Sequence, residues 1–130
     1  MKYLPQIAAV LLFLPFSILG AAFLAGALPQ PPPPPAGSLP ALFMDAMMPS
    51  GYMVFVKVLE IIGGILVVIP RTRNLGLLFL GPIIVNIIAF HVFILQGEGL
   101  VNPILGVIVA AALYLLWHGR TAWAGLLRRV

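Results

Sequence analysis

Two charged residues, Lys57 and Glu60, lie inside a long apolar segment that runs from Tyr52 to Ile69. A charged side chain at the centre of a membrane-spanning helix is costly and usually faces the interior of a helix bundle. A spacing of three residues places both side chains on one face of a helix, where they can form an ion pair. Two interpretations stay open. Either the pair is structural, with a lysine that can extend toward the membrane surface, or it handles protons or binds a ligand.

Three further polar residues, Tyr52, Asn86 and His91, interrupt apolar segments of the chain. At about 1.5 Å per residue along each helix, Asn86 lies at the depth of the charged pair. Tyr52 and His91 lie closer to one membrane surface. We therefore predict a ligand-binding site that is formed by Lys57, Glu60, Asn86, His91 and Tyr52.

The role of His91 has two interpretations, because His91 follows Asn86 by five residues and an ideal helix points the two side chains in different directions. Gly81-Pro82 lies just before them. A proline inside a helix usually causes a kink, which can narrow the angle between the two side chains. His91 is therefore predicted either as a ligand-binding residue or as a residue that forms a hydrogen bond between helices.

The composition of the chain indicates a membrane protein. Of its 130 residues, 62% are hydrophobic and 8% are charged, whereas a soluble domain carries about 25% charged residues. These values exclude a soluble enzyme and a disordered chain. The net charge of +4 is scattered over short loops and lacks the basic stripe that nucleic-acid binding needs. The lipid bilayer is thus the expected partner, and nucleic acid is not.

Breaks in the apolar pattern predict four membrane-spanning helices within a single domain of residues 1–130, since a span needs about 20 residues. The predicted fold is all-α, a transmembrane four-helix bundle with a short extra interfacial helix before the second span. That extra helix covers Ser38 to Met48, which is too short to cross a bilayer. The predicted spans are residues 5–28, 52–69, 75–95 and 102–118.

The connections between the predicted spans are polar or rich in proline. The run at residues 31–35 consists of proline only, so we predict a stiff polyproline II spacer. A proline-rich binding motif is the alternative. Polar turns are expected at residues 71–74 and 96–99, and the tail at residues 119–130 resembles a short amphipathic helix at the membrane surface.

The distribution of Lys and Arg predicts that both termini face the cytoplasm. With four spans, one side of the membrane holds only Asp45 and Glu98 among the charged loop residues. The opposite side holds Lys2, Arg71, Arg73, Arg120, Arg128 and Arg129.

The apolar stretch at residues 7–28 is longer than the about 7–15 apolar residues of a signal peptide, so we expect a retained first helix rather than a cleaved signal.

The sequence predicts no metal site. The absence of cysteine excludes disulfides, thiolate metal sites and iron–sulfur clusters. Four methionines, at positions 44, 47, 48 and 53, are expected near His91, and methionine with histidine can bind copper(I). Methionine is also an adaptable filler of apolar gaps, and we favour that interpretation.

The polar residues form part of a longer pattern. It consists of Gly51-Tyr52, Lys57, Glu60-Ile61, Gly63-Gly64, Arg71, Gly81-Pro82-Ile83-Ile84-Val85-Asn86-Ile87 and Phe90-His91. This pattern resembles the DoxX family of small bacterial four-helix membrane proteins. The resemblance covers most of the chain from Phe43 to Leu95, and its most specific part is the run from Pro82 to His91. It implies an inner-membrane bundle with Lys57, Glu60, Asn86 and His91 as the polar centre.

Three hypotheses for the function follow. The family takes its name from a subunit of a thiosulfate:quinone oxidoreductase, and other members are linked to redox stress. The leading hypothesis is therefore an accessory or redox-linked protein of the bacterial inner membrane that binds a small lipophilic ligand such as quinone. The second is a small proton-coupled transporter that uses Glu60, and the third is a structural subunit. No catalytic residue is predicted, and a partner subunit or a homo-oligomer is compatible with each hypothesis.

Overall fold

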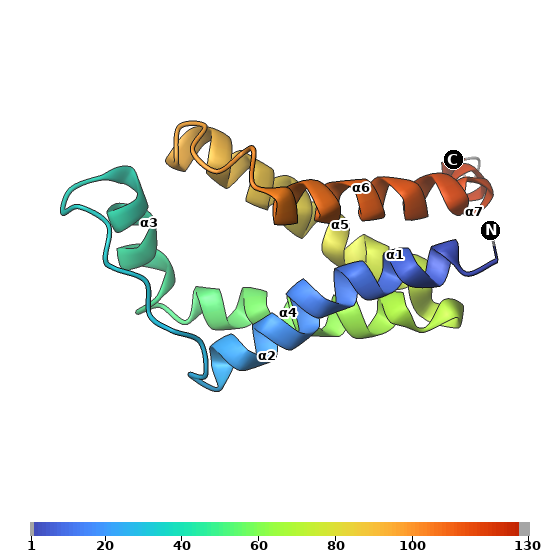
Figure 1. Cartoon of the computed structure of the whole chain (residues 1–130), viewed down its shortest axis with the longest axis horizontal. Helices are drawn as coiled ribbons and strands as arrows, with labels where there is room; N and C mark the ends of the chain where they lie inside the picture. Colours follow the sequence, from blue (N-terminus) through green and yellow to red (C-terminus); the bar gives the residue numbers. More distant parts are fainter. Residues whose placement is uncertain (1, 128–130) are drawn as a thin grey trace.

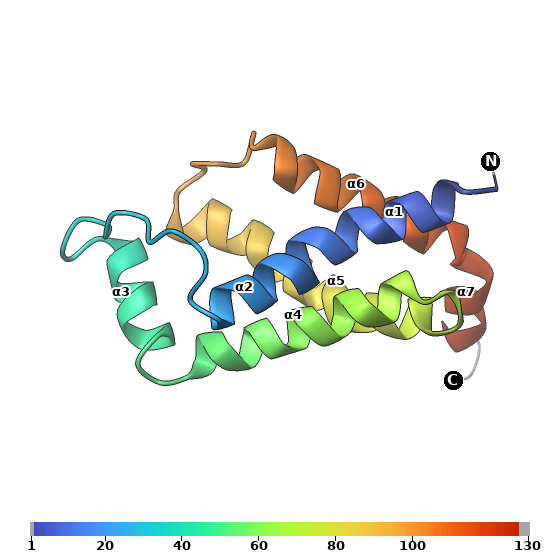
Figure 2. The same cartoon turned by 60° about the horizontal axis from the view of Figure 1, so that its bottom comes forward.

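The computed structural model describes residues 2–127, and all regular secondary structure in this range is helical. The first helical segment consists of α1 (Leu4–Phe13), a π-helical turn η1 (Leu14–Ile18) and α2 (Leu19–Leu24), which follow one another without a break (Figure 2). Pro15 has no backbone N–H to donate. The chain passes it with a wider turn, in which the N–H of Leu19 bonds the carbonyl of Leu14.

The first helix ends at Leu24, four residues before the predicted end at residue 28. Gly26 adopts a left-handed conformation with φ +71°. Its N–H bonds the carbonyl of Phe23 at 3.1 Å, and the N–H of Ala27 bonds the carbonyl of Ala22 at 2.9 Å. These two bonds form a Schellman cap, which satisfies the last carbonyls of the helix. The helix is therefore stopped by a glycine, and not by the proline run.

The predicted short helix before the second span is present as α3 (Leu39–Met47), and none of its residues is buried. The Ser38 hydroxyl accepts a hydrogen bond from the N–H of Ala41 at 3.4 Å and caps the helix. After α3 the chain turns at Gly51, which has φ +81°, into α4 (Tyr52–Val68). The two helices meet at an angle of 81°, so α3 stands across the end of α4 (Figure 1).

The polar turn expected at residues 71–74 is helical instead. A short 3₁₀ turn η2 (Pro70–Thr72) leads directly into α5 (Arg73–Ala89). The Thr72 hydroxyl donates to the carbonyl of Leu66 at 2.8 Å, and the Arg73 Nε donates to the carbonyl of Val67 at 3.0 Å. Because side chains satisfy the last carbonyls of α4, the chain reverses direction without an open loop.

The last part of the described chain contains the end of α5 and two further helices. α5 continues into a π-helical turn η3 (Phe90–Ile94), and α6 (Pro103–His118) follows after a loop. The Asn102 side chain accepts from the N–H of Ile104 at 2.9 Å and caps α6. The helix predicted in the tail is present as α7 (Arg120–Leu127). Residues 128–130, with Arg128 and Arg129 of the predicted basic set, lie outside the described residues.

The long helical segments pack side by side through apolar and small residues (Figures 1 and 2). Gly63 lies against Leu80 of α5, and Gly64 lies against Ser17 of η1. Small residues of this kind let helix backbones approach closely. Because the backbones are close here, the Ser17 hydroxyl can donate a hydrogen bond to the carbonyl of Ile61 at 2.9 Å. The largest fully buried side chains are Leu12, Phe16, Val67, Leu80 and Leu115.

Two helical segments, Leu4–Leu24 and Pro70–Ile94, are long and apolar enough to span a membrane. α3 and α4 pass the same test together as one bent pair. α6 has 16 residues, and at about 1.5 Å per residue it is shorter than a hydrocarbon core of about 30 Å. Two or three spans by length support the predicted membrane protein.

Candidate functional site

The charged pair in α4 is formed as its spacing predicts. The Lys57 Nζ lies 3.3 Å from the Glu60 Oε2. The Glu60 side chain is buried at 8% exposure, whereas that of Lys57 is 24% exposed. The Lys57 Nζ also lies over the ring of Phe23 in α2, at 5.2 Å from the ring centroid. The ammonium group is therefore stabilised by a carboxylate and by the face of an aromatic ring.

A cleft of about 600 Å³ lies beside this pair. Four of the five predicted site residues line it: Tyr52, Lys57, Glu60 and Asn86. α4 supplies the first three, and α5 supplies Asn86. The cleft thus joins the polar residues that the sequence places at one depth.

The remaining walls of the cleft are apolar. α3 contributes Phe43, Met44 and Met47, and η3 contributes Phe90 and Phe93. The cleft therefore combines a polar region at the charged pair with walls of methionine and aromatic side chains. Clefts of this size with few polar groups are typical of sites for small apolar molecules.

The side chain of Asn86 makes one hydrogen bond within its own helix. Its Nδ2 donates to the carbonyl of Pro82 at 3.0 Å. This bond uses one of the two amide hydrogens, so the amide retains a second N–H donor and its oxygen acceptor. Asn86 is exposed, which leaves these groups accessible from the cleft that the residue lines.

His91 is not brought together with the other predicted site residues, because it does not line the cleft. Its Nδ1 bonds the carbonyl of Ile87 at 2.8 Å. Because a carbonyl oxygen only accepts, the proton lies on Nδ1. The ring also faces the loop before α6, where a Cβ on Gly99 would come within 3.1 Å of the His91 Cδ2. Neither a role at the cleft nor a hydrogen bond between helices is seen for His91.

Three of the four methionines expected near His91 line the cleft. Met44, Met47 and Met53 line the cleft, but Met48 does not. Among the described residues, no group of three or more His, Cys, Asp and Glu side chains is placed to hold a metal ion. The three cleft methionines contribute apolar surface to its walls.

The sequence alone does not reveal that α3 forms a wall of the cleft or that Phe23 contacts Lys57. Both depend on how the helices pack. One local signal was available, since the apolar residues of α3 recur at Phe43, Met44 and Met47, as expected for a helix with one apolar face.

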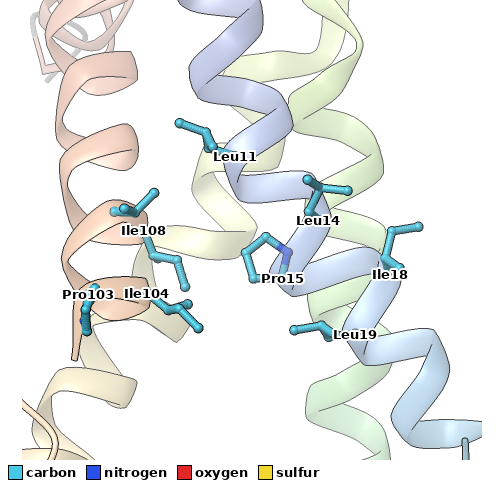
Figure 3. Close-up of a pocket in the computed structure, with 9 residues that line it drawn as sticks. Leu11, Leu14, Pro15, Ile18, Leu19, Pro103, Ile104 and Ile108 are labelled. Carbon is cyan, nitrogen blue, oxygen red and sulfur yellow. The ribbon is translucent and has the colours of Figure 1, made fainter. Parts of the chain in front are cut away.

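A second cavity of about 410 Å³ lies between the first helical segment and α6 (Figure 3). Its lining contains no titratable residue. Pro15 points into it from the π-helical turn, facing Ile104 and Ile108 of α6. This cavity offers apolar contact only, in contrast to the cleft beside Lys57 and Glu60.

A comparison with known proteins finds a bacterial relative whose name states no function. Over 78 residues, the chain is 33% identical to "Uncharacterized protein YwoB" of Bacillus subtilis (strain 168). The match covers 60% of this chain and 49% of that protein, so the chain spans about half the length of the curated relative that it matches. No family model matches the chain, and no solved structure matches it.

Proposed function

We propose that this protein is an accessory or redox-linked membrane protein that binds a small lipophilic ligand in the cleft between α3, α4 and α5. The observation that carries the proposal is the position of the Lys57–Glu60 pair at the wall of an otherwise apolar cleft of about 600 Å³. A ligand with an apolar body and a polar head matches both parts of this cleft.

Quinone is the ligand that we favour. A quinone carbonyl needs hydrogen-bond donors, and the ammonium of Lys57 has three, one of which points at Glu60. The amide of Asn86 offers a second donor. When a redox partner reduces a quinone by two electrons, the quinone also takes up two protons, and the carboxyl group of Glu60, once protonated, is suited to pass one of them to it. The aromatic and methionine side chains of the walls suit a planar ring and an isoprenoid tail.

The proposal includes a four-span bundle of the DoxX type in the bacterial inner membrane, with both termini in the cytoplasm. The side-by-side packing of α1–α2, α4, α5 and α6 supports four spans. The resemblance at Lys57, Glu60 and Asn86 supports the family, and the similarity to a Bacillus subtilis protein supports a bacterial origin. The partner is a subunit or a second copy of the chain.

Binding of decylubiquinone to the purified protein in detergent tests the proposal by isothermal titration calorimetry. Asn86→Ala is expected to weaken binding about tenfold, which corresponds to the loss of one hydrogen bond of about 1.4 kcal/mol. Val85→Ala is the matched control, because Val85 is 66% exposed and does not line the cleft. Equal binding by the parent and by Asn86→Ala, or no binding by the parent, contradicts the proposal.

Proton-coupled transport is the second candidate, and the burial of the Glu60 carboxyl group beside an open cleft favours it. A carboxyl group at such a position can gain and lose a proton while a substrate occupies the cleft. Proteoliposomes with an imposed pH gradient distinguish the candidates. Substrate uptake that follows the gradient and is lost in Glu60→Gln supports transport. The absence of both uptake and quinone binding leaves a structural subunit as the explanation.

A further inference from the structure

The exposed charges in the described part of the chain, residues 2–127, are divided between its two ends. Lys2, Arg71 and Arg120 are exposed at the end that holds the start of α1, the turn between α4 and α5, and α7 (Figures 1 and 2). Asp45 in α3 and Glu98 in the loop before α6 are exposed at the other end. We call the set of Lys2, Arg71 and Arg120 the basic end.

Packing fixes the position of these charges relative to one another. Gly119, between α6 and α7, lies so close to Asn74 that an added Cβ would be 2.9 Å from the Asn74 Oδ1. Asn74 belongs to the first turn of α5, three residues after Arg71, and Arg120 directly follows Gly119. The basic end is therefore built where two helix termini meet, and not by the chance proximity of mobile loops.

Aromatic rings accompany two of the charges. The Arg120 guanidinium lies 4.3 Å from the centroid of the Trp117 ring, and its Nη1 donates to the Trp117 carbonyl at 3.0 Å. The Lys2 Nζ lies 5.7 Å from the centroid of the Tyr3 ring. Trp117 and Tyr3 are 60% and 69% exposed. Exposed Trp and Tyr at a helix end are typical of the interface between a bilayer and water.

Arg73, the fourth cation in this region, has a different role. Its Nη2 donates to the Gln6 Oε1 at 2.7 Å, and its Nε donates to the carbonyl of Val67 at 3.0 Å. These bonds direct the guanidinium of Arg73 toward the protein. Arg120 makes one such bond, to the Trp117 carbonyl at the end of α6, and keeps further N–H donors, which match the oxygen atoms of a phosphate group.

We propose that the basic end binds the headgroups of anionic phospholipids in the leaflet where it lies. Charge complementarity carries the proposal, because these exposed cations gather at one end of the helices while Asp45 and Glu98 are exposed at the opposite end. A Lys or Arg near a membrane surface contributes about a fivefold preference for an anionic over a neutral surface. The proposal is independent of the cleft and of any ligand in it.

Tryptophan fluorescence provides the test, because both tryptophans of the chain, Trp117 and Trp123, lie at this end. The full chain is reconstituted in phosphatidylcholine vesicles that contain either brominated phosphatidylglycerol or brominated phosphatidylcholine at equal mole fraction. We expect the brominated anionic lipid to quench the fluorescence more strongly, with a relative binding constant of at least about five, the contribution of a single Lys or Arg. Raising the salt concentration should lower this preference, because salt screens surface charges.

Variants distinguish a headgroup site from general adsorption. Arg71→Gln/Arg120→Gln should lower the relative binding constant at least about fivefold, whereas Arg71→Lys/Arg120→Lys should retain it. Glu98→Gln, which changes an exposed charge at the opposite end, should leave it unchanged. Arg71→Gln alone provides a second test with an exposed side chain, should the double variant fail to fold. Equal quenching by the two lipids in the parent, or an unchanged preference in the Gln variants, overturns the proposal.

Discussion

Phe43 of α3 and Phe90 of η3 lie with their ring centroids 4.7 Å apart and their planes inclined at 53°. This contact joins two segments that are distant in the sequence, and both rings line the cleft. α3 has no buried residue and packs against η3. The aromatic pair therefore holds α3 in place as a wall of the cleft.

Phe43→Ala is expected to loosen α3 and to weaken ligand binding. An aromatic pair contributes about 0.5–1.5 kcal/mol beyond the burial of its area, and α3 has few other contacts to replace it. Hydrogen exchange of the amides in residues 39–47 should accelerate about threefold to tenfold, while exchange in α4 and α5 stays slow. Leu42→Ala is the matched control, since Leu42 is 55% exposed and lies outside the cleft. Equal acceleration in both variants would show that the aromatic contact does not fix α3.

The Lys57–Glu60 pair should respond unequally to the loss of either partner. Lys57→Met leaves a buried carboxylate without its cation, which typically costs about 3–5 kcal/mol. Glu60→Leu leaves a lysine that is 24% exposed and already contacts the Phe23 ring, so the loss of stability should be smaller. Thermal melts in detergent should therefore rank Lys57→Met below Glu60→Leu.

The double variant Lys57→Met/Glu60→Leu tests the coupling between these residues. Replacing both charges with apolar side chains removes the unpaired carboxylate, so much of the stability that Lys57→Met loses should return. Val58→Ala serves as a control for changes in α4, because Val58 is exposed and does not line the cleft. Additive losses in the double variant would contradict a direct interaction between the charges.

The parts of the structure that follow local rules are predictable from the sequence. The charged pair at Lys57 and Glu60 follows from helix periodicity, and the start of α3 follows from Ser38 as a cap. The common depth of these charges and Asn86 follows from counting residues along two helices, and the cleft joins them as expected.

The remaining features do not follow from the apolar pattern of the sequence. The early end of the first helix depends on the left-handed Gly26, which competes with an apolar run that continues to Leu28. The helical turn at residues 70–72 depends on side-chain bonds from Thr72 and Arg73 to carbonyls of α4. The separation of His91 from the cleft agrees with its spacing of five residues from Asn86, which points the two side chains in different directions, and the kink expected at Pro82 does not bring His91 into the cleft.

The proposed orientation predicts the result of reporter fusions. Reporters after Val130 and at Arg73 should be cytoplasmic, and a reporter within the proline run at residues 31–35 should be outside, because Lys and Arg are retained on the cytoplasmic side. Alkaline phosphatase and green fluorescent protein fusions give opposite signals for the two sides. A cytoplasmic signal from the proline run would reverse the proposed orientation or remove the first span.

The approach of η1 to α4 predicts a strong effect of one added methyl group. A Cβ on Gly64 would overlap the Ser17 Oγ and lie 3.2 Å from the Ser17 Cβ, so Gly64→Ala must separate the two helices or break the bond from Ser17 to Ile61. Overpacking of this kind costs about 1–3 kcal/mol, and the melting temperature in detergent should fall. Gly106→Ala in α6 is the matched control, because its Cβ would meet nothing within 4 Å. That variant should be neutral or stabilised by about 0.5–1 kcal/mol through its higher helix propensity. A parent-like melt for Gly64→Ala would show that η1 and α4 are not in close contact in the membrane protein.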